Sequence, residues 1–395
     1  MSVIDIWEET MIVGVPEEIA ENETRVALVP SGAEKLADRG HEVVVESGAG
    51  SNAGYSDQEY RNAGCSIAPD RETVFDRAEI LLQVRGLGAN PERTSDPYTE
   101  GQIVIGLLGP YRADASLDDL AKKDVSAFSL ELVPRISRAQ QMDAQSSQAN
   151  IGGYKAAILG AEQLPKLFPL MMTAAGTVQP ADVFVVGAGV AGLQAIATAD
   201  RLGATVTSYD IRPEVKEEVE SVGAEFVELD LETEDSADEE GHARKMDEEF
   251  YRKQREMMQR VVADSDVVIT TAAVPGETAP ELVTESMVEG MDAGSVIVDL
   301  AAESGGNCEV TEPDETVEYE DVTVLGPTNL PATVPRHASE LYDTNVRNFL
   351  DLLLTDGEID VDTEDEIVDA TLLTHDGVRR DPHLEEETEE EEDTE

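Results

Sequence analysis

Short apolar runs alternate with amphipathic segments along most of the chain, and this alternation is typical of parallel βα units. In the first third, buried strands are predicted at 11–15, 41–45, 79–84, 102–108 and 125–130. Helices are predicted between them, and Ser31 with Glu34 three residues later has the form of a capping box. This pair is expected to begin the first helix, which Gly40 ends.

A second series of the same kind begins at Asp182, with predicted strands at 183–186, 205–209, 267–271, 295–300 and 322–325. A polar, amide-rich stretch at 135–143 and a predicted long helix at 144–159 separate the two series. Apolar spacing also predicts a helix at 338–354 that packs back on the first series. Beyond residue 354 the chain is expected to be acidic and loop-like.

These patterns predict an α/β protein with two doubly wound parallel-sheet, Rossmann-like domains, the first of them discontinuous. We expect a first, flavodoxin-type domain over 11–135 plus 330–380, a linker loop and helix over 136–160, and a second domain over 161–329. The last residues are nearly all Glu, Asp and Thr. An acidic tail over 381–395 is therefore expected to be disordered.

The chain of 395 residues carries 28 Lys and Arg against 85 Asp and Glu, a formal net charge of −57. Such a charge argues against nucleic-acid binding and disfavours adsorption to anionic lipid, because phosphates are repelled. It also destabilises a compact fold in dilute buffer, and molar salt removes this penalty by screening charges beyond about 3 Å. We therefore expect a salt-rich cytoplasm, as in a halophile. The alternative is stabilisation by cationic partners.

Cysteine content and apolar runs indicate a chain that is soluble by itself. Cys65 and Cys308 are too few for a disulfide framework and lack the spacing of a metal site, so no metal is expected. The apolar stretch at 167–176 is far shorter than the ~20 residues of a membrane helix. Residues 1–10 have no secretory signal. We expect no direct membrane insertion.

A glycine motif after the apolar run 182–186 is the strongest chemical signal. Gly187, Gly189 and Gly192 form the pattern G-x-G-x-x-G between a predicted strand and a predicted helix. The first glycine permits a tight turn, the second the close approach of a pyrophosphate, and the third close packing of helix on strand. The helix N-terminus supplies N–H donors for the phosphates. The alternative is that the glycines serve packing alone.

The strand after this motif ends in Asp210, which bears on the choice of dinucleotide. A carboxylate at this place accepts both ribose hydroxyls of NAD and repels a 2′-phosphate. Arg212, two residues later, would instead favour NADP. The carboxylate makes NAD the expected cofactor.

Several segments together resemble the alanine dehydrogenase and nicotinamide nucleotide transhydrogenase superfamily. They are VGVPEE (13–18), NETRVA (22–27), ESGAG (46–50), DLAA (299–302), GGNC (305–308) and TNLP (328–331). PRISRAQ (134–140) with MDA (142–144) is similar to the Arg-Gln-Asp loop of the transhydrogenase NAD(H)-binding domain, and DIRPEVKE (210–217) is likewise transhydrogenase-like. LTHDG (373–377) resembles the segment before the membrane part of longer alpha subunits.

The resemblance implies an enzyme that moves hydride between NAD(H) and NADP(H), coupled to proton movement across a membrane. This chain would be the alpha subunit that holds NAD(H). A partner subunit would hold NADP(H), and membrane subunits would carry the proton path. The family also implies a homodimer, which would lie at the cytoplasmic face of the cell membrane through these partners.

The resemblance further implies that Arg135, Gln140 and Asp143 form a loop over the nicotinamide, with Ser146 as another contact. The Gln140 amide can donate to and accept from the carboxamide, and Asp143 would hold Arg135 through a charge-assisted pair. Without the family, this stretch is a polar helix start with Asp143 as its cap. The other expected cofactor contacts are Gly187, Ala188, Gly189, Val190, Gly192, Asp210, Ile211 and Arg212.

The family's mobile loop corresponds to residues 232–245, an acidic, glycine-containing stretch that would act as a lid over the cofactor. The family has a Tyr in this loop where this chain has His242. This departure argues against an aromatic lid contact.

Two other functions stay open from the sequence. An alanine dehydrogenase needs acid–base groups at an imine and cationic anchors for a carboxylate. Where that family has its His, Lys and Asp, this chain has Gly109, Arg85 and Glu303, and only Arg25 persists. Hydride passage between two nicotinamides needs no acid or base at the carbon, so the missing His favours transhydrogenation. A non-catalytic NAD(H)-sensing module would need the glycine cradle alone.

Overall fold

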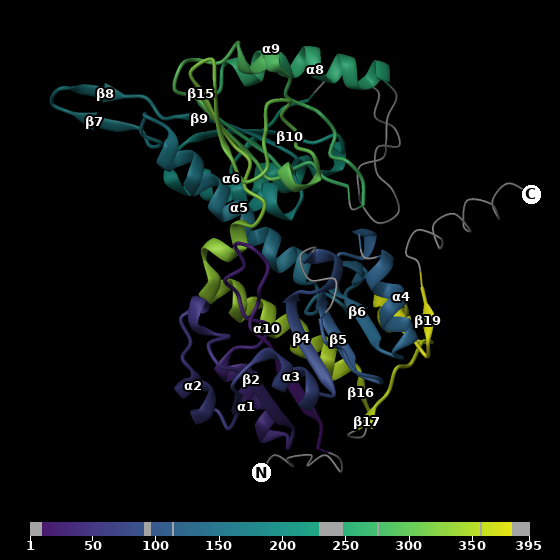
Figure 1. Cartoon of the computed structure of the whole chain (residues 1–395). Coiled ribbons are helices and arrows are strands. Elements are labelled where there is room, and N and C mark those ends of the chain that lie inside the picture. Colours follow the sequence, from purple (N-terminus) through teal and green to yellow (C-terminus); the bar gives the residue numbers. More distant parts are fainter. Residues whose placement is uncertain are drawn as a thin grey trace, which may run out of the picture. The chain divides into compact units, whose positions relative to one another are not determined.

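The computed structural model describes residues 10–90, 96–112, 114–228, 248–274, 276–355 and 358–380. The predicted lid at 232–245 with His242, and the predicted acidic tail at 381–395, lie outside the described residues. The chain divides into two compact units (Figure 1). Unit 1 comprises Met1–Gln148 and Ala332–Glu395, and unit 2 comprises Ala149–Pro331.

Unit 1 is built on an eight-stranded sheet. Its strands are β1 (Ile12–Val15), β2 (Glu42–Glu46), β3 (Ser66–Ala68), β4 (Ile80–Arg85), β5 (Ile103–Leu107), β6 (Ser126–Ser129), β18 (Leu372–His375) and β19 (Val378–Arg379). Their order in space is β19-β18-β6-β5-β4-β1-β2-β3, parallel from β6 to β3 and antiparallel at β18 and β19. The chain leaves β1 toward β2 and returns on the other side at β4. This reversal is a topological switch point.

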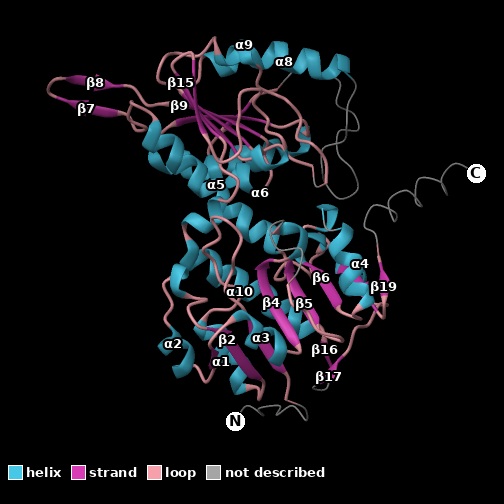
Figure 2. Cartoon of the chain, viewed as in Figure 1, coloured by secondary structure: helices cyan, strands magenta, loops and turns pink. Residues whose placement is uncertain are grey.

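Helices cover both faces of the unit 1 sheet (Figure 2). One face holds α1 (Pro30–Asp38), α2 (Asp57–Asn62), α10 (Pro335–Leu352) and α11 (Glu366–Thr371), and the other holds α3 (Arg71–Arg77) and α4 (Asp114–Lys122). Val13 and Val15 of β1 face the first group, whereas Leu81 of β4 faces the second. Alternate strand residues thus enter two separate apolar cores, which is why these strands are apolar throughout.

Unit 2 is built on a seven-stranded sheet. Its strands are β9 (Asp182–Val186), β10 (Thr205–Tyr209), β11 (Glu225–Phe226), β12 (Val267–Thr270), β13 (Val296–Asp299), β14 (Thr316–Tyr319) and β15 (Val322–Leu325). The order is β11-β10-β9-β12-β13-β15-β14, parallel except for β14. The chain leaves β9 toward β10 and returns on the other side at β12, which makes a second switch point.

The helices of unit 2 also lie on two faces. Residues of α5 (Ala144–Gln163), α6 (Val190–Leu202) and α7 (Lys216–Ser221) pack on one face, and α8 (Glu248–Ala263) and α9 (Glu285–Val288) on the other. The chain passes from unit 1 into unit 2 inside α5. None of the described helices combines the length and the apolar character that a membrane crossing requires.

Shorter elements complete the described chain. A hairpin of β7 (Met171–Thr173) and β8 (Gly176–Val178) projects away from the sheet of unit 2 (Figure 1). A second small pair joins β16 (Leu354–Thr355) and β17 (Glu358–Ile359) in unit 1. Single 3₁₀ turns are η1 (Ser51–Ala53), η2 (Leu87–Ala89), η3 (Pro110–Arg112), η4 (Leu130–Leu132), η5 (Pro213–Val215), η6 (Ala302–Ser304) and η7 (Leu330–Thr333).

The predicted α/β class with two doubly wound, Rossmann-like sheets is confirmed, but the predicted capping box at Ser31 is wrong. α1 begins at Pro30, and its N-cap, Val29, makes no side-chain capping bond. Proline suits the first helical position because it has no N–H to satisfy and its φ is already helical. A capping box does occur at α2, where Ser56 and Glu59 each bond to the other's backbone N–H.

The end of the described chain is more regular than the sequence predicts. Instead of a loop beyond residue 354, α11 and β18 are present, and β18 pairs antiparallel with β6. Leu372 and Leu373 of β18 are buried. These two leucines face opposite cores, so a pair of adjacent apolar residues suffices to attach the strand.

Candidate functional site

The glycine motif forms the turn between β9 and α6, at the switch point of unit 2. Gly187 has φ +95°, a left-handed conformation that favours glycine. A Cβ on Gly187 would lie 2.6 Å from the Thr271 Oγ1 atom, just past β12, and a Cβ on Gly192 would lie 1.8 Å from the Gly187 carbonyl oxygen. Both glycines are therefore required by the packing of the protein itself.

Gly189 is different, because no contact with the described residues requires a glycine there. It is the N-cap of α6 with φ −76° and ψ −170°, which any residue can adopt. Among the described residues, no atom lies within 4 Å of a Cβ built on Gly189, and both Gly189 and Val190 are exposed. The space at the N-terminus of α6 is open to a group from outside the chain. A diphosphate fits this cradle, because the first N–H groups of a helix have no partner within the helix.

A second helix supports the cradle from behind. A Cβ on Gly153 of α5 would lie 2.0 Å from the Ala191 carbonyl oxygen, so α5 contacts the first turn of α6 closely. Gly153 was not predicted as part of the site. The sequence does contain a signal, a Gly-Gly pair inside a predicted helix. Each glycine destabilises the helix by about 1 kcal/mol relative to alanine, so such a pair indicates close packing at that point.

Asp210 links the second strand of the motif to the glycine turn. The Oδ2 atom accepts from the Ala188 backbone N–H at 2.7 Å, and Oδ1 accepts from the Arg212 backbone N–H at 2.9 Å. The Arg212 guanidinium also pairs with this carboxylate, Nε to Oδ1 at 3.0 Å, and this hydrogen bond raises the pKa of Arg212. Ile211 between them is half-buried. The structure thus brings the predicted residues 187–192 and 210–212 together at one edge of one sheet.

The predicted polar loop lies in unit 1 and is held by its apolar residues. Ala139 and Met142 are buried, and Ile136 packs against the same core. Arg135 and Gln140 are exposed, and neither side chain has a hydrogen-bond or ion-pair partner among the described residues. The loop therefore presents these two side chains on a fixed backbone.

Asp143 does not hold Arg135, so the expected ion pair is wrong for this structure. The Asp143 carboxylate lies before the first residue of α5 and accepts from the Ser146 backbone N–H at 2.7 Å and from the Ser146 hydroxyl. The first N–H groups of a helix have no partner within the helix and bind a nearby carboxylate. In this structure Asp143 binds such an N–H group and not the Arg135 guanidinium. Asp143 is a helix cap, the alternative that the sequence left open.

Two residues that fasten this loop could not be predicted from the sequence. Arg138 donates both terminal nitrogens to Asp365, at 2.5 and 2.9 Å, and Asp365 also caps α11. The hydrogen bond from Arg138 lowers the pKa of Asp365. Asn345 of α10 donates to the Gln141 carbonyl oxygen at 3.0 Å. No local signal indicates these contacts, because their partners are more than 200 residues away in the sequence.

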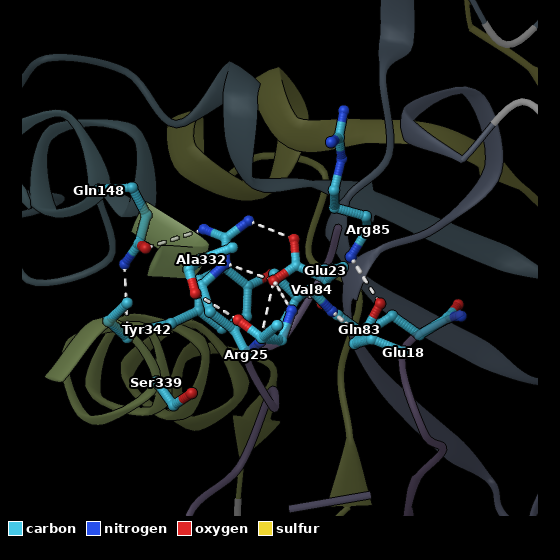
Figure 3. Close-up of polar contacts among 12 residues, drawn as sticks. Glu18, Glu23, Arg25, Gln83, Val84, Arg85, Gln148, Ala332, Ser339 and Tyr342 are labelled. Carbon is cyan, nitrogen blue, oxygen red and sulfur yellow. Dashed lines mark hydrogen bonds and ion pairs between the residues drawn. The ribbon is translucent and has the colours of Figure 1, made fainter. Parts of the chain in front are cut away.

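The switch point of unit 1 is occupied by charged side chains of the chain itself (Figure 3). Glu18 accepts from the backbone N–H groups of Val84 and Arg85 at the end of β4, at 2.5 and 3.1 Å. Arg25 grips Glu23 with Nε and Nη2, at 2.8 and 2.6 Å, and its Nη1 donates to Gln148 at 2.8 Å. Arg25 is 4% exposed, and the Glu23 side chain is fully buried.

The neighbouring strand end is closed in the same way. Glu131 accepts from the backbone N–H groups of Leu108 and Gly109, at 3.0 and 2.8 Å, just past β5. Gly109 stands where the alanine dehydrogenase pattern has its histidine. Arg25 is the one residue of the alanine dehydrogenase substrate pattern that this chain keeps. Its guanidinium donates to Glu23.

Profiles of known families match both halves of the chain. The N-terminal domain of "Alanine dehydrogenase/PNT" matches residues 14–152, and the C-terminal domain of the same family matches residues 156–381. The chain belongs to the alanine dehydrogenase/PNT family. The resemblance inferred from the sequence motifs is therefore confirmed.

Within this family, relatives named transhydrogenase are prominent. The NAD(P) transhydrogenase subunit alpha of Cereibacter sphaeroides is 45% identical over 93% of this chain and 70% of its own length. The protein of the same name from Haemophilus influenzae is 42% identical over 93% and 71%. A crystal structure of transhydrogenase from Sinorhizobium meliloti has a TM-score of 0.82 at 42% identity, covering 93% of this chain and 100% of that one. The alanine dehydrogenase of Mycolicibacterium smegmatis is more distant, at 30% identity over 93% and 94%.

Proposed function

We propose that this chain is the NAD(H)-binding alpha subunit of a proton-translocating NAD(P)⁺ transhydrogenase. It passes hydride between NADH in its own site and NADP⁺ held by a partner subunit. The observation that carries this proposal is the open cradle at Gly189 beside Asp210, in a chain 42–45% identical to proteins named NAD(P) transhydrogenase subunit alpha.

Each part of the site has a task in this reaction. The backbone N–H groups at the start of α6 bind the diphosphate, and Asp210 accepts from the adenosine ribose. The loop of Arg135 and Gln140 contacts the nicotinamide, where the Gln140 amide fixes the carboxamide and so the orientation of the ring. The nicotinamide supplies the hydride when it is bound. No acid or base is needed at the carbon, only near-attack geometry and exclusion of water.

The roles of the loop residues are tested by Gln140→Ala. We expect the hydride-transfer rate to fall by roughly 100-fold, because misplacement by 1 Å costs that much. The NADH dissociation constant should change less than about threefold, since the diphosphate and ribose contacts remain. Transhydrogenation is measured with an added NADP(H)-binding partner, and binding by calorimetry. Gln141→Ala is the matched control, because Gln141 is an exposed glutamine on the same loop.

The same preparation separates the other functions. Oxidation of NADH by pyruvate with ammonia, with no partner added, would identify an alanine dehydrogenase and refute the proposal. Binding of NADH with neither activity would identify a sensor. The closed switch point of unit 1, where Glu23 engages the fork of Arg25, argues against a substrate carboxylate there.

The homodimer is also part of the proposal. Met171, Met172 and Val178 of the β7–β8 hairpin are exposed, Met172 to 75%. Exposed apolar side chains gathered on one projecting element are typical of a surface that another chain covers. A second copy of this chain is the partner we propose. Sedimentation of Met172→Glu should show a monomer where the unchanged chain shows a dimer.

The surroundings of the protein follow from its partners and its charge. Through its membrane subunits the chain lies at the cytoplasmic face of the cell membrane. The net charge of −57 supports a halophilic host, because molar salt screens the repulsion among so many like charges. The melting temperature should rise steeply between low and molar KCl, and a flat response would refute the halophilic part.

A further inference from the structure

The carboxylate of Asp210 is fully used by its own chain. A carboxylate has about four lone-pair sites for hydrogen bonds. Its Oδ1 atom accepts from the backbone N–H and Nε of Arg212, at 2.9 and 3.0 Å. Its Oδ2 atom accepts from the Ala188 backbone N–H at 2.7 Å and from Arg212 Nη2 at 3.1 Å. All four positions are therefore taken, and two ribose hydroxyls would need two of them.

We propose that Arg212 competes with the nucleotide ribose for Asp210 and thereby sets how strictly the site distinguishes NAD(H) from NADP(H). This inference rests on the proposed function. Of the four donors, the two backbone N–H groups are fixed by the glycine turn and by the turn after β10. Only the guanidinium can leave, because it stands on a flexible side chain. Ribose hydroxyls bind Asp210 by displacing it.

The displaced guanidinium changes how the site meets a 2′-phosphate. It remains next to the ribose, because Arg212 is only two residues from Asp210. The Asp210 and Arg212 side chains are 6% and 17% exposed, so their charges act at short range with little screening by water. A 2′-phosphate then meets a carboxylate and a guanidinium together instead of a bare carboxylate. Arg212 therefore lowers the affinity for NADH, because it competes with the ribose for Asp210. Its positive charge raises the affinity for NADPH, because it offsets the repulsion between Asp210 and the 2′-phosphate.

Arg212→Gln separates these two effects because they have opposite signs. We expect the variant to bind NADH three- to tenfold more tightly and NADPH at least tenfold more weakly, by calorimetry in molar KCl. Arg201→Gln is the matched control, since it removes one exposed positive charge from the last turn of α6, and both affinities should stay unchanged. Asp210→Asn should bind NADPH more tightly, and Asp210→Asn with Arg212→Gln should lose that gain.

The possible failures are distinct. If Arg212→Gln weakens both nucleotides together, Arg212 merely supports the fold of the site and the proposal is overturned. Unchanged affinities for both nucleotides would overturn it as well. If Arg212→Gln does not fold, Arg212→Lys tests the same point, because it keeps the charge but not the fork, and we expect tighter NADH with NADPH little changed. An unchanged protein that binds no NADH would refute the proposed function, and this inference with it.

Discussion

Strand β1 of unit 1 and strand β9 of unit 2 stand at equivalent places, each between two parallel neighbours at a point where the strand order reverses. The turn after β9 is Gly187-Ala188-Gly189, and none of the described residues has an atom within 4 Å of a Cβ built on Gly189. After β1, the chain returns with its own charged groups. Glu18 takes the N–H groups at the end of β4, and Arg25 is bound by Glu23.

This difference shows what a switch point needs in order to bind a ligand. Open α/β sheets bind ligands where the strand order reverses, because backbone donors converge there without a covering helix. A carboxylate from the same chain satisfies those donors as well as a ligand would. The fold therefore contains two switch points, and the side chains around them determine that the one in unit 2 is open.

The largest effect is expected from opening the closed switch point. Arg25→Met leaves the buried Glu23 carboxylate without its guanidinium, and breaking a buried pair costs about 3–5 kcal/mol. Urea unfolding at constant salt should show that loss in unit 1. The double variant Glu23→Gln with Arg25→Met should recover most of it, because no uncompensated charge is left. A single variant within 1 kcal/mol of the unchanged chain would contradict the structural role.

Crowding the open switch point comes next. In Gly192→Ala the new methyl group collides with the Gly187 carbonyl oxygen, and overpacking of this kind costs about 1–3 kcal/mol. The turn must shift, so NADH binding should be lost together with stability. Thermal unfolding and calorimetry measure the two effects. Tight NADH binding by this variant would show that the turn is not the diphosphate site.

Glu18 provides a test by pH. Burial, with the nearby charge of Glu23, raises the pKa of Glu18 from 4.5 to about 7. The folded state resists deprotonation between these two values, so the contribution of Glu18 to stability falls as pH rises from about 4.5 to 7. In Glu18→Gln this pH dependence is absent. The variant should therefore be more destabilised, relative to the unchanged chain, at pH 5 than at pH 8, by about 2 kcal/mol.

Measurement of the unfolding free energy of both proteins at the two pH values decides this point. Glu17→Gln is the control, since it removes a neighbouring carboxylate outside the buried network. A difference that is equal at pH 5 and pH 8 would mean that Glu18 is ionised throughout and that its contacts with β4 do not depend on protonation.

The sequence predicted the structure correctly where a local requirement restricts the residue type strongly. Strands such as 183–186 are buried on both faces and therefore apolar without interruption, and sterics within six residues require two glycines of the motif, Gly187 and Gly192. β3 was missed, because three residues are too few to show a period. Pro30 shows the limit of capping signals, since a proline one residue upstream overrode Ser31.

The candidate site was predicted in part for the same reason. Asp143 has two candidate partners, the Arg135 guanidinium and the N-terminus of α5. The sequence alone does not show which of them is better placed to bind the carboxylate. The pair of Arg138 and Asp365 joins residues 227 positions apart, through a segment that was predicted to be a loop. Local chemistry could be predicted, whereas contacts set by the tertiary fold could not.

The smallest change bears most directly on the contrast between the two switch points. In Gly189→Ala one methyl group enters the space at the start of α6, where it meets no atom of the described residues. The unfolding free energy should fall by no more than about 1 kcal/mol, which is the usual difference between glycine and alanine as an N-cap. NADH affinity should fall by about tenfold, or about 1.4 kcal/mol, because the methyl group holds the diphosphate away from the N–H groups.

Gly290→Ala, a glycine with ordinary φ elsewhere in unit 2, should leave NADH affinity unchanged. A loss of stability well above about 1 kcal/mol with Gly189→Ala would mean that the space is needed by the protein after all. Unchanged NADH affinity would mean that the diphosphate does not lie in the space at Gly189. The two switch points would then differ in their side chains, but the one in unit 2 would not be shown to bind a ligand. A tenfold loss of affinity with a loss of stability no larger than that of the N-cap change means that the glycine at this position is retained for a ligand.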